Sequence, residues 1–67
     1  MNTIVKGIVK FFNEEKGFGF IIQDGTKKEI FVHRNETKEY LQENDEVQFV
    51  IATGNKGPFA SQVEIVQ

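Results

Sequence analysis

Residues 16–21 have the sequence Lys-Gly-Phe-Gly-Phe-Ile, and residues 30–33 have the sequence Ile-Phe-Val-His. Successive side chains of a β-strand point to opposite faces, so each stretch separates rings from aliphatic groups. One face carries Phe18, Phe20, Phe31 and His33. The other carries Ile21, Ile30 and Val32. A closed core requires only the aliphatic face. The sequence therefore predicts a sheet with rings on its outer surface, which is the kind of surface on which single-stranded bases stack.

Turn signals divide the chain into five strand-like runs. Asp24-Gly25 is a hairpin signal, and the Gly-rich, Pro-containing residues 53–58 mark another turn. The predicted strands cover residues 5–13, 18–23, 29–33, 46–52 and 59–66. Residues 34–44 form the longest connection and are predicted to be mainly loop, although their composition also suits a helical turn. Short strands with one long connection predict an all-β fold, a small Greek-key barrel.

Strand parity assigns some apolar residues to the inner or outer face of the sheet and leaves the face of others open. Val47, Phe49 and Ile51 share a face that is expected to point inward. Phe11 and Phe12 are adjacent, so simple alternation sends them to opposite faces, whereas a bulge would turn both toward one side. For Phe12, partial core burial and binding are both open. Phe59 shares parity with apolar residues of the last strand, and a core or barrel-end role is expected.

Length and composition restrict the class of protein. The chain of 67 residues is expected to be one domain, residues 1–67, with a small core. It has no cysteine, which fits the reducing cytoplasm, and no run approaches the length of a membrane helix. Lys6 and Lys10 interrupt what would be a signal peptide's apolar segment, so the mature protein is expected to be the whole chain. A net charge of −2 means that stacking, rather than phosphate neutralisation, must supply much of any nucleic-acid affinity.

Three motifs together resemble the bacterial cold-shock protein family. Residues 7–21, Gly-Ile-Val-Lys-Phe-Phe-Asn-Glu-Glu-Lys-Gly-Phe-Gly-Phe-Ile, are similar to the family's opening, and residues 16–20 resemble its first ribonucleoprotein motif. Residues 30–33 resemble the second motif, and residues 54–58 resemble the turn before the last strand. The resemblance spans nearly the entire chain. It implies a five-stranded antiparallel Greek-key barrel of the OB-fold type that binds single-stranded RNA or DNA and acts as an RNA chaperone.

The resemblance also implies a binding surface. The residues that it points to are Lys10, Phe11, Asn13, Lys16, Phe18, Phe20, Phe31, His33 and Lys56. Phe11 stands where the family usually has Trp, and Phe59 stands where it usually has a polar residue. Arg34 replaces a usual aromatic, and because a guanidinium can stack or contact phosphate, Arg34 joins the predicted surface. The loop after Arg34 is shorter than the family's, and Tyr40 is the candidate substitute for the aromatic expected there.

Other readings of the same residues remain open. The rings could instead form a second hydrophobic layer or an oligomer interface, and Lys10 and Lys16 could be merely solvated charges. The rival function is a protein-interaction module, or one that self-associates through the aromatic face or an edge strand. A monomer is expected, with an edge-strand or swapped dimer as the alternative.

Catalysis and cofactor binding are not expected. His33 is the only histidine and there is no cysteine, so no metal site is predicted. Ser61 lies in an ordinary strand pattern, and neither a dinucleotide fingerprint nor a phosphate loop is present. The sequence therefore predicts a binding protein without an enzymatic activity or a cofactor.

Overall fold

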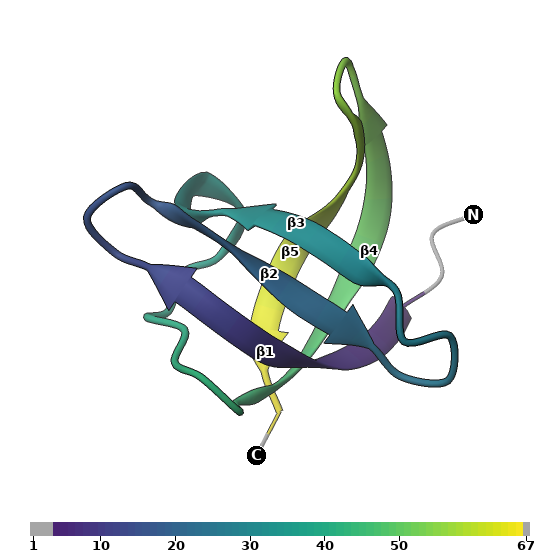
Figure 1. Cartoon of the computed structure of the whole chain (residues 1–67), viewed down its shortest axis with the longest axis horizontal. Coiled ribbons are helices and arrows are strands. Elements are labelled where there is room, and N and C mark those ends of the chain that lie inside the picture. Colours follow the sequence, from purple (N-terminus) through teal and green to yellow (C-terminus); the bar gives the residue numbers. More distant parts are fainter. Residues whose placement is uncertain (1–3, 67) are drawn as a thin grey trace.

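The computed structural model describes residues 4–66, which form five strands around one core. The strands are β1 (Ile4–Asn13), β2 (Phe18–Gln23), β3 (Glu29–His33), β4 (Glu46–Gly54) and β5 (Gly57–Ile65). They close into a barrel in the order β1-β2-β3-β5-β4 (Figure 1). The all-β fold and the five predicted strands are confirmed, with differences of a few residues at strand ends. The expected domain limits, residues 1 and 67, lie outside the described residues.

Strand pairing is antiparallel except where the barrel closes. β1 pairs with β2 and β4, and antiparallel pairs also join β2 to β3 and β4 to β5. β3 and β5 run parallel, with Phe31 opposite Phe59 and Val32 opposite Ala60. The β4–β5 hairpin extends beyond the barrel (Figure 1). The closing pair thus brings residues from the middle and the end of the chain side by side.

The long connection between β3 and β4 is mainly irregular, as predicted. It begins with a single 3-10 turn, η1 (Arg34–Glu36), and Thr37 then bridges to Val63 of β5. The Ser61 hydroxyl donates a 2.8 Å hydrogen bond to the carboxylate of Glu36. These contacts hold the connection against β5. Among the described residues, no helix is long and apolar enough to cross a membrane.

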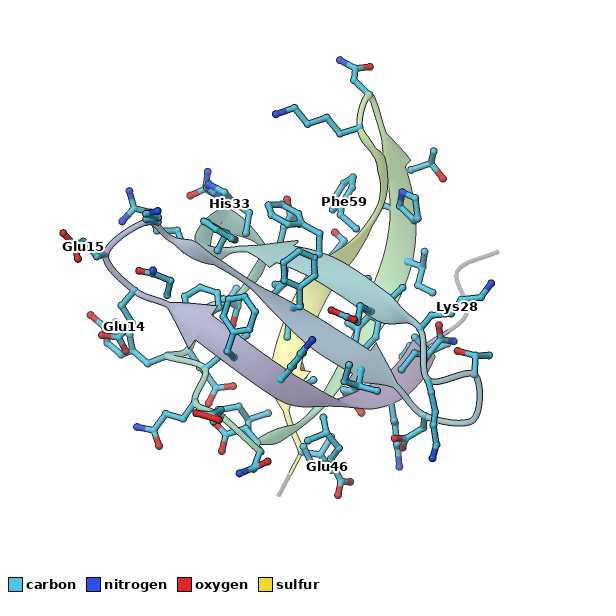
Figure 2. The ribbon with its side chains drawn as sticks, in the orientation of Figure 1. Glu14, Glu15, Lys28, His33, Glu46 and Phe59 are labelled. Atoms are coloured by element: carbon cyan, nitrogen blue, oxygen red, sulfur yellow. The ribbon has the colours of Figure 1, made fainter. Side chains whose placement is uncertain are left out.

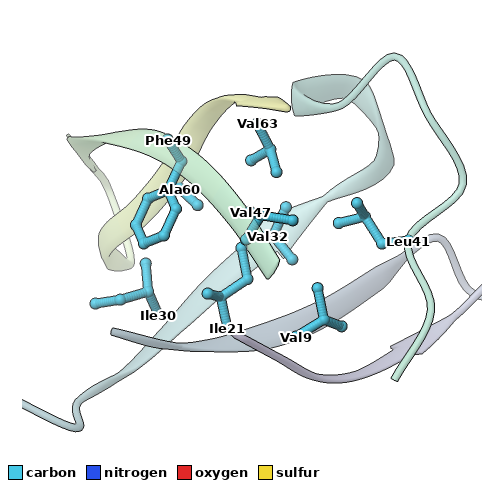
Figure 3. Packing of buried hydrophobic residues seen from close by; sticks show 9 residues of the cluster. All are labelled: Val9, Ile21, Ile30, Val32, Leu41, Val47, Phe49, Ala60 and Val63. Atoms are coloured by element: carbon cyan, nitrogen blue, oxygen red, sulfur yellow. The ribbon is translucent and has the colours of Figure 1, made fainter. Parts of the chain in front are cut away.

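The core contains the aliphatic face predicted from the sequence together with one ring. Its buried side chains are Val9, Ile21, Ile30, Val32, Leu41, Val47, Phe49, Ala60 and Val63 (Figure 3). Phe49 is the largest fully buried side chain, so its inward orientation is confirmed. Alternation predicts that Ile51 also points inward, but Ile51 is 38% exposed because it lies beyond Val50, the last residue of β4 that pairs with β1.

Of the two roles expected for Phe59, in the core or at the barrel end, the core role is wrong, and the reason is a bulge in β5. Gln48 pairs with Glu64 whereas Val50 pairs with Ser61, so β5 has one extra residue between these pairs. Gln62 has a left-handed backbone there, with φ of 54°. The bulge reverses the alternation, so Ala60 and Val63 are both buried although they are three residues apart. Phe59 stands opposite Phe31 instead of joining the core.

Candidate nucleic-acid interface

A bulge in β1 orients its two adjacent rings. Val9 pairs with Ile21 and Phe11 pairs with Phe20, so Lys10 is the extra residue of β1 between these pairs. Phe11 is 37% exposed on the outer surface, whereas Phe12 is half-buried and packs against the core. The bulge therefore resolves the two phenylalanines into one surface ring and one partly buried ring.

Four phenylalanine rings form a continuous row across the outer faces of β1, β2 and β3. We call Phe11, Phe20, Phe31 and Phe18 the ring row. The ring centroids of Phe11 and Phe20 are 5.6 Å apart, and those of Phe20 and Phe31 are 5.9 Å apart. Phe18 and Phe31 are stacked at 5.8 Å, with their planes inclined by 24°. These are favourable distances for aromatic pairs, so the rings support one another while Phe11 and Phe31 remain accessible.

Gly19 is the residue that allows β1 and β2 to approach beneath the ring row. A Cβ at this position would lie 2.8 Å from Cα of Phe12, closer than real Cβ atoms come to backbone atoms. Any side chain here would push the two strands apart. The Phe-Gly-Phe pattern therefore combines two outward rings with the close strand approach that positions Phe11 next to Phe20.

Two polar side chains at one end of the ring row accept hydrogen bonds from nearby backbone N–H groups. The backbone N–H of Asn35 donates to Nδ1 of His33 at 3.2 Å, which fixes the imidazole at the start of η1. The side-chain oxygen of Asn13 accepts a 3.0 Å hydrogen bond from the backbone N–H of Lys16. Both predicted binding residues therefore have a structural contact of their own. His33 lies at the end of β3, as Figure 2 shows.

The predicted cationic residues surround the rings without forming a cluster of their own. Lys10 makes an ion pair with Glu29, at 3.1 Å between Nζ and Oε1. Lys16 is exposed in the β1–β2 turn, and Lys56 is exposed in the β4–β5 hairpin turn. The positive charge is therefore distributed along the periphery of the interface.

Arg34 occupies the end of the interface next to His33. Its backbone N–H donates a 2.8 Å hydrogen bond to the carbonyl oxygen of Gly17, and its side chain crosses that glycine. A Cβ on Gly17 would lie 2.9 Å from Cδ of Arg34. Arg34 also lines a hollow of about 460 Å³ together with Phe12, Glu14 and Tyr40. Tyr40 is 79% exposed, so the position predicted as an aromatic substitute does present an accessible ring.

Phe59 is the member of this surface that the sequence reasoning missed. It lines a second hollow with Phe20, Phe31 and residues 54–58 of the β4–β5 hairpin. In Figure 2 it lies at the base of the projecting hairpin. The available signal is that Phe59 stands where the family that the sequence resembles usually has a polar residue. Parity within β5 nevertheless points to the core or the barrel end, because the sequence gives no sign of the bulge at Gln62.

The arrangement is suited to binding flat, apolar groups that carry negative charge nearby. Exposed ring faces provide stacking surfaces, and the peripheral lysines and Arg34 can contact phosphates. The ring row brings together Phe11, Phe18, Phe20 and Phe31, with His33 and Arg34 at one end. Lys10, Lys16 and Lys56 come from three separate segments around it.

Comparisons with known proteins find a family match over nearly the whole chain. The sequence profile of the 'Cold-shock' DNA-binding domain family matches residues 5–66. The cold shock protein CspV of Vibrio cholerae is 45% identical over 67 residues, covering 94% of this chain and 96% of the relative. A cold shock protein of Arthrobacter globiformis is 46% identical, covering 94% of this chain and all of the relative (100%). The cold shock-like protein CspA of Bordetella pertussis is 44% identical over 64 residues, covering 90% of this chain and 96% of the relative.

A solved structure has the same fold at lower sequence identity. The structure described as Drosophila Unr CSD456 superposes with a TM-score of 0.80 at 22% identity. The superposition covers 97% of this chain and 27% of the Unr chain. The likeness supports the barrel architecture independently of the closer sequence relatives.

Proposed function

This chain belongs to the cold-shock DNA-binding domain family, and from that membership we propose that it binds single-stranded RNA or DNA by stacking bases on the ring row. The proposed contact residues are those predicted from the sequence, which include both the rings and the cations around them. The protein acts by binding and not by catalysis. As an RNA chaperone, it holds transcripts in single-stranded form and thereby opposes their self-pairing.

The observation that carries the proposal is the ring row itself. Four phenylalanines lie on the outer faces of three adjacent strands, with neighbouring centroids 5.6–5.9 Å apart. The core is filled by a different set of residues on the inner faces. Rings on this surface are not needed to close the barrel, and Phe11 and Phe31 each remain 37% exposed. Base stacking gives such rings a role, because every base has a π-face.

The charge distribution supports a mode of binding in which stacking dominates. The net charge is −2, so the whole molecule does not attract a polyanion. Lys10, Lys16, Arg34 and Lys56 nevertheless stand around the rings and offer local phosphate contacts. This combination favours flexible single strands, whose bases can be splayed onto the rings, over duplexes, whose bases are already stacked.

The proposal extends to the chain as a unit. Residues 1–67 would act as a single cold-shock domain, and an RNA chaperone would work in the cytoplasm, where transcripts are found. As a monomer it could coat a single strand along its length, with each copy covering a short segment.

The test is a titration of the protein with fluorescently labelled pyrimidine-rich single strands and with the corresponding duplexes. A labelled oligonucleotide is required because the chain has no Trp and only one Tyr. The proposal predicts binding to single strands and much weaker binding to duplexes. Chaperone activity is tested by thermal melting of an RNA hairpin. The protein should lower the melting temperature of the hairpin, and more so as it occupies more of the opened strand.

The rival function, self-association through the same surface, is tested by sedimentation of the same samples. Within residues 4–66 each strand pairs with two neighbours, which disfavours dimerisation through a free edge. A dimer that forms without nucleic acid and fails to bind single strands would favour the rival.

A further inference from the structure

The two partner strands of β5 place Phe59 beside the ring row. In the parallel β3–β5 pair Phe59 stands opposite Phe31, and in the antiparallel β4–β5 pair it stands opposite Ala52. Directly paired residues of a sheet point to the same side. Phe31 points outward, so Phe59 extends the aromatic surface from β3 onto β5.

The β4–β5 hairpin turns this extension into a hollow. A space of about 470 Å³ is lined by Phe20, Phe31, Phe59 and residues 54–58. Gly54 leaves room for the Phe59 ring, because a Cβ there would lie 3.1 Å from Cε1 of Phe59. The ring is therefore held between the hairpin and the ring row, and it is only partly buried.

We propose that this hollow is a separate base-binding position, in which Phe59 stacks on one nucleobase of a bound single strand. The inference rests on the proposed function, because the strand must already lie on the ring row. The hollow shares two of its walls, Phe20 and Phe31, with that row. The next base along a bound strand therefore reaches it without leaving the surface.

The chemistry of the walls favours a base over other occupants. Phe59 and Pro58 supply apolar surface, whereas Lys56, in the hairpin turn, supplies a cation for the adjoining phosphate. A nucleotide has both a flat apolar face and a charged backbone, so it satisfies both features at once. The polar side chains of the lining, Asn55 and Lys56, belong to the hairpin turn. We therefore expect this position to bind any flat base and to discriminate little between the bases.

The first experiment compares three variants in their binding to labelled oligothymidylate of about eight nucleotides, a length within the usual site size of an OB-fold. Phe59→Ala should weaken binding roughly 5- to 100-fold, the usual effect of losing one base–aromatic stack. Phe59→Leu keeps apolar bulk without a π-face and should also weaken binding. Ile51→Ala is the control, because Ile51 is an exposed apolar residue of β4 that does not line the hollow, and it should bind like the parent.

The second experiment tests for direct contact with a base. Abasic sugars are placed at successive positions of the same oligonucleotide, and each is measured with the parent and with Phe59→Leu. At one position, loss of the base should weaken binding to the parent but have little effect on Phe59→Leu, because the stacking partner has already been removed. Phe59→Trp should restore the sensitivity at that position.

The outcomes separate this inference from the function on which it rests. If the parent does not bind single strands, the proposed function is wrong, and the inference with it. If the parent binds and Phe59→Leu binds equally well, the hollow is not a base position, although the ring row can still be the interface. Equal sensitivity of the parent and Phe59→Leu to every abasic position would also overturn the inference. Phe59→Leu decides the question even if Phe59→Ala fails to fold.

Discussion

Nζ of Lys10 lies 3.1 Å from Oε1 of Glu29, and this ion pair joins β1 to β3 across the outer face of β2. Lys10 is the extra residue of the β1 bulge, which separates Phe11 from Val9, and Glu29 begins β3. A proposed phosphate contact is thus occupied by a carboxylate in the free protein. Both side chains are about half exposed, at 49% and 50%, so solvent screens the pair and keeps it exchangeable.

Glu29→Gln should therefore tighten single-strand binding by a few-fold at low salt. The substitution removes a negative charge near the ring row and releases Lys10 for a phosphate, and the advantage should fade as salt rises. The free energy of unfolding should change by less than about 1 kcal/mol, because exposed ion pairs contribute little. Thermal unfolding and oligonucleotide titration at several salt concentrations check both points. Glu64→Gln, a charge change at an exposed position of β5, is the control, and unchanged or weaker binding by Glu29→Gln at low salt would contradict the expectation.

Removing single rings from the ring row should separate binding from folding. Phe18→Ala, Phe20→Ala and Phe31→Ala should each weaken single-strand binding by ~1–3 kcal/mol while the barrel still folds. Phe20→Ala and Phe31→Ala should be less stable than Phe18→Ala, since Phe20 and Phe31 each make two aromatic pairs whereas Phe18 makes one, and each pair contributes about 0.5–1.5 kcal/mol.

Titrations and thermal melts of the same three proteins provide the measurement. Ile4→Ala is the matched control, because Ile4 is 61% exposed on β1 and lies outside the ring row. If all three ring variants bound like the parent, or if all three unfolded, the assignment of the ring row as a stacking platform would be wrong.

The rings and the strands could be predicted from the sequence because both depend on local information. Alternation within β2 and β3 separated Phe18, Phe20 and Phe31 from the core, and these two strands have no bulge to disturb it. Turn residues located the strand ends, and the inward position of Phe49 followed from the same alternation. Where a strand lies within the barrel and has no bulge, the structure agrees with alternation; Ile51, near the end of β4 that leaves the barrel, is exposed despite its inward parity.

The remaining features depend on pairing between distant segments. The left-handed residue Gln62 reverses parity within β5, so alternation alone predicts a core or barrel-end role for Phe59, whereas it stands beside Phe31. Nothing local to residues 57–65 reveals that β5 pairs in parallel with β3. The ion pair of Lys10 similarly requires the lateral order of β1, β2 and β3 and the bulge in β1. Bulges and closing strands are therefore the points at which reasoning from this sequence fails.

Salt dependence should reveal how little of the affinity is electrostatic. With Lys10, Lys16, Lys56 and Arg34 as the phosphate partners, ~3–4 counterions would be released, and a single-strand slope of about −0.7 per contact predicts a log K against log salt slope near −2 to −3. The slope is measured by titrating one labelled oligonucleotide over a range of salt concentrations. A slope steeper than about −5 would require more phosphate contacts than the cations around the ring row provide.

Arg34→Phe should tighten binding at moderate salt. Arg34 follows His33 at the end of β3, next to the hollow that Phe12 and Tyr40 line, so a ring there would continue the aromatic surface. An added base stack contributes ~1–3 kcal/mol, whereas one exposed charge contact usually contributes about 0–1 kcal/mol, and stacking should therefore outweigh the lost cation. The salt slope should become shallower by roughly 0.7, and the advantage over the parent should grow as salt rises.

Arg34→Lys separates the two properties of the side chain, because it keeps the charge but loses the planar group. The comparison must be made where sedimentation shows both proteins to be monomeric, since an added exposed ring promotes self-association. Arg34→Lys should keep the parent's salt slope.

If monomeric Arg34→Phe bound more weakly than the parent at high salt, two explanations would remain, and Arg34→Lys would distinguish them. A matching loss in Arg34→Lys would identify the guanidinium as a stacking or base-contacting group. Retained affinity in Arg34→Lys would indicate that the shortened loop directs position 34, held across Gly17, away from the bound strand.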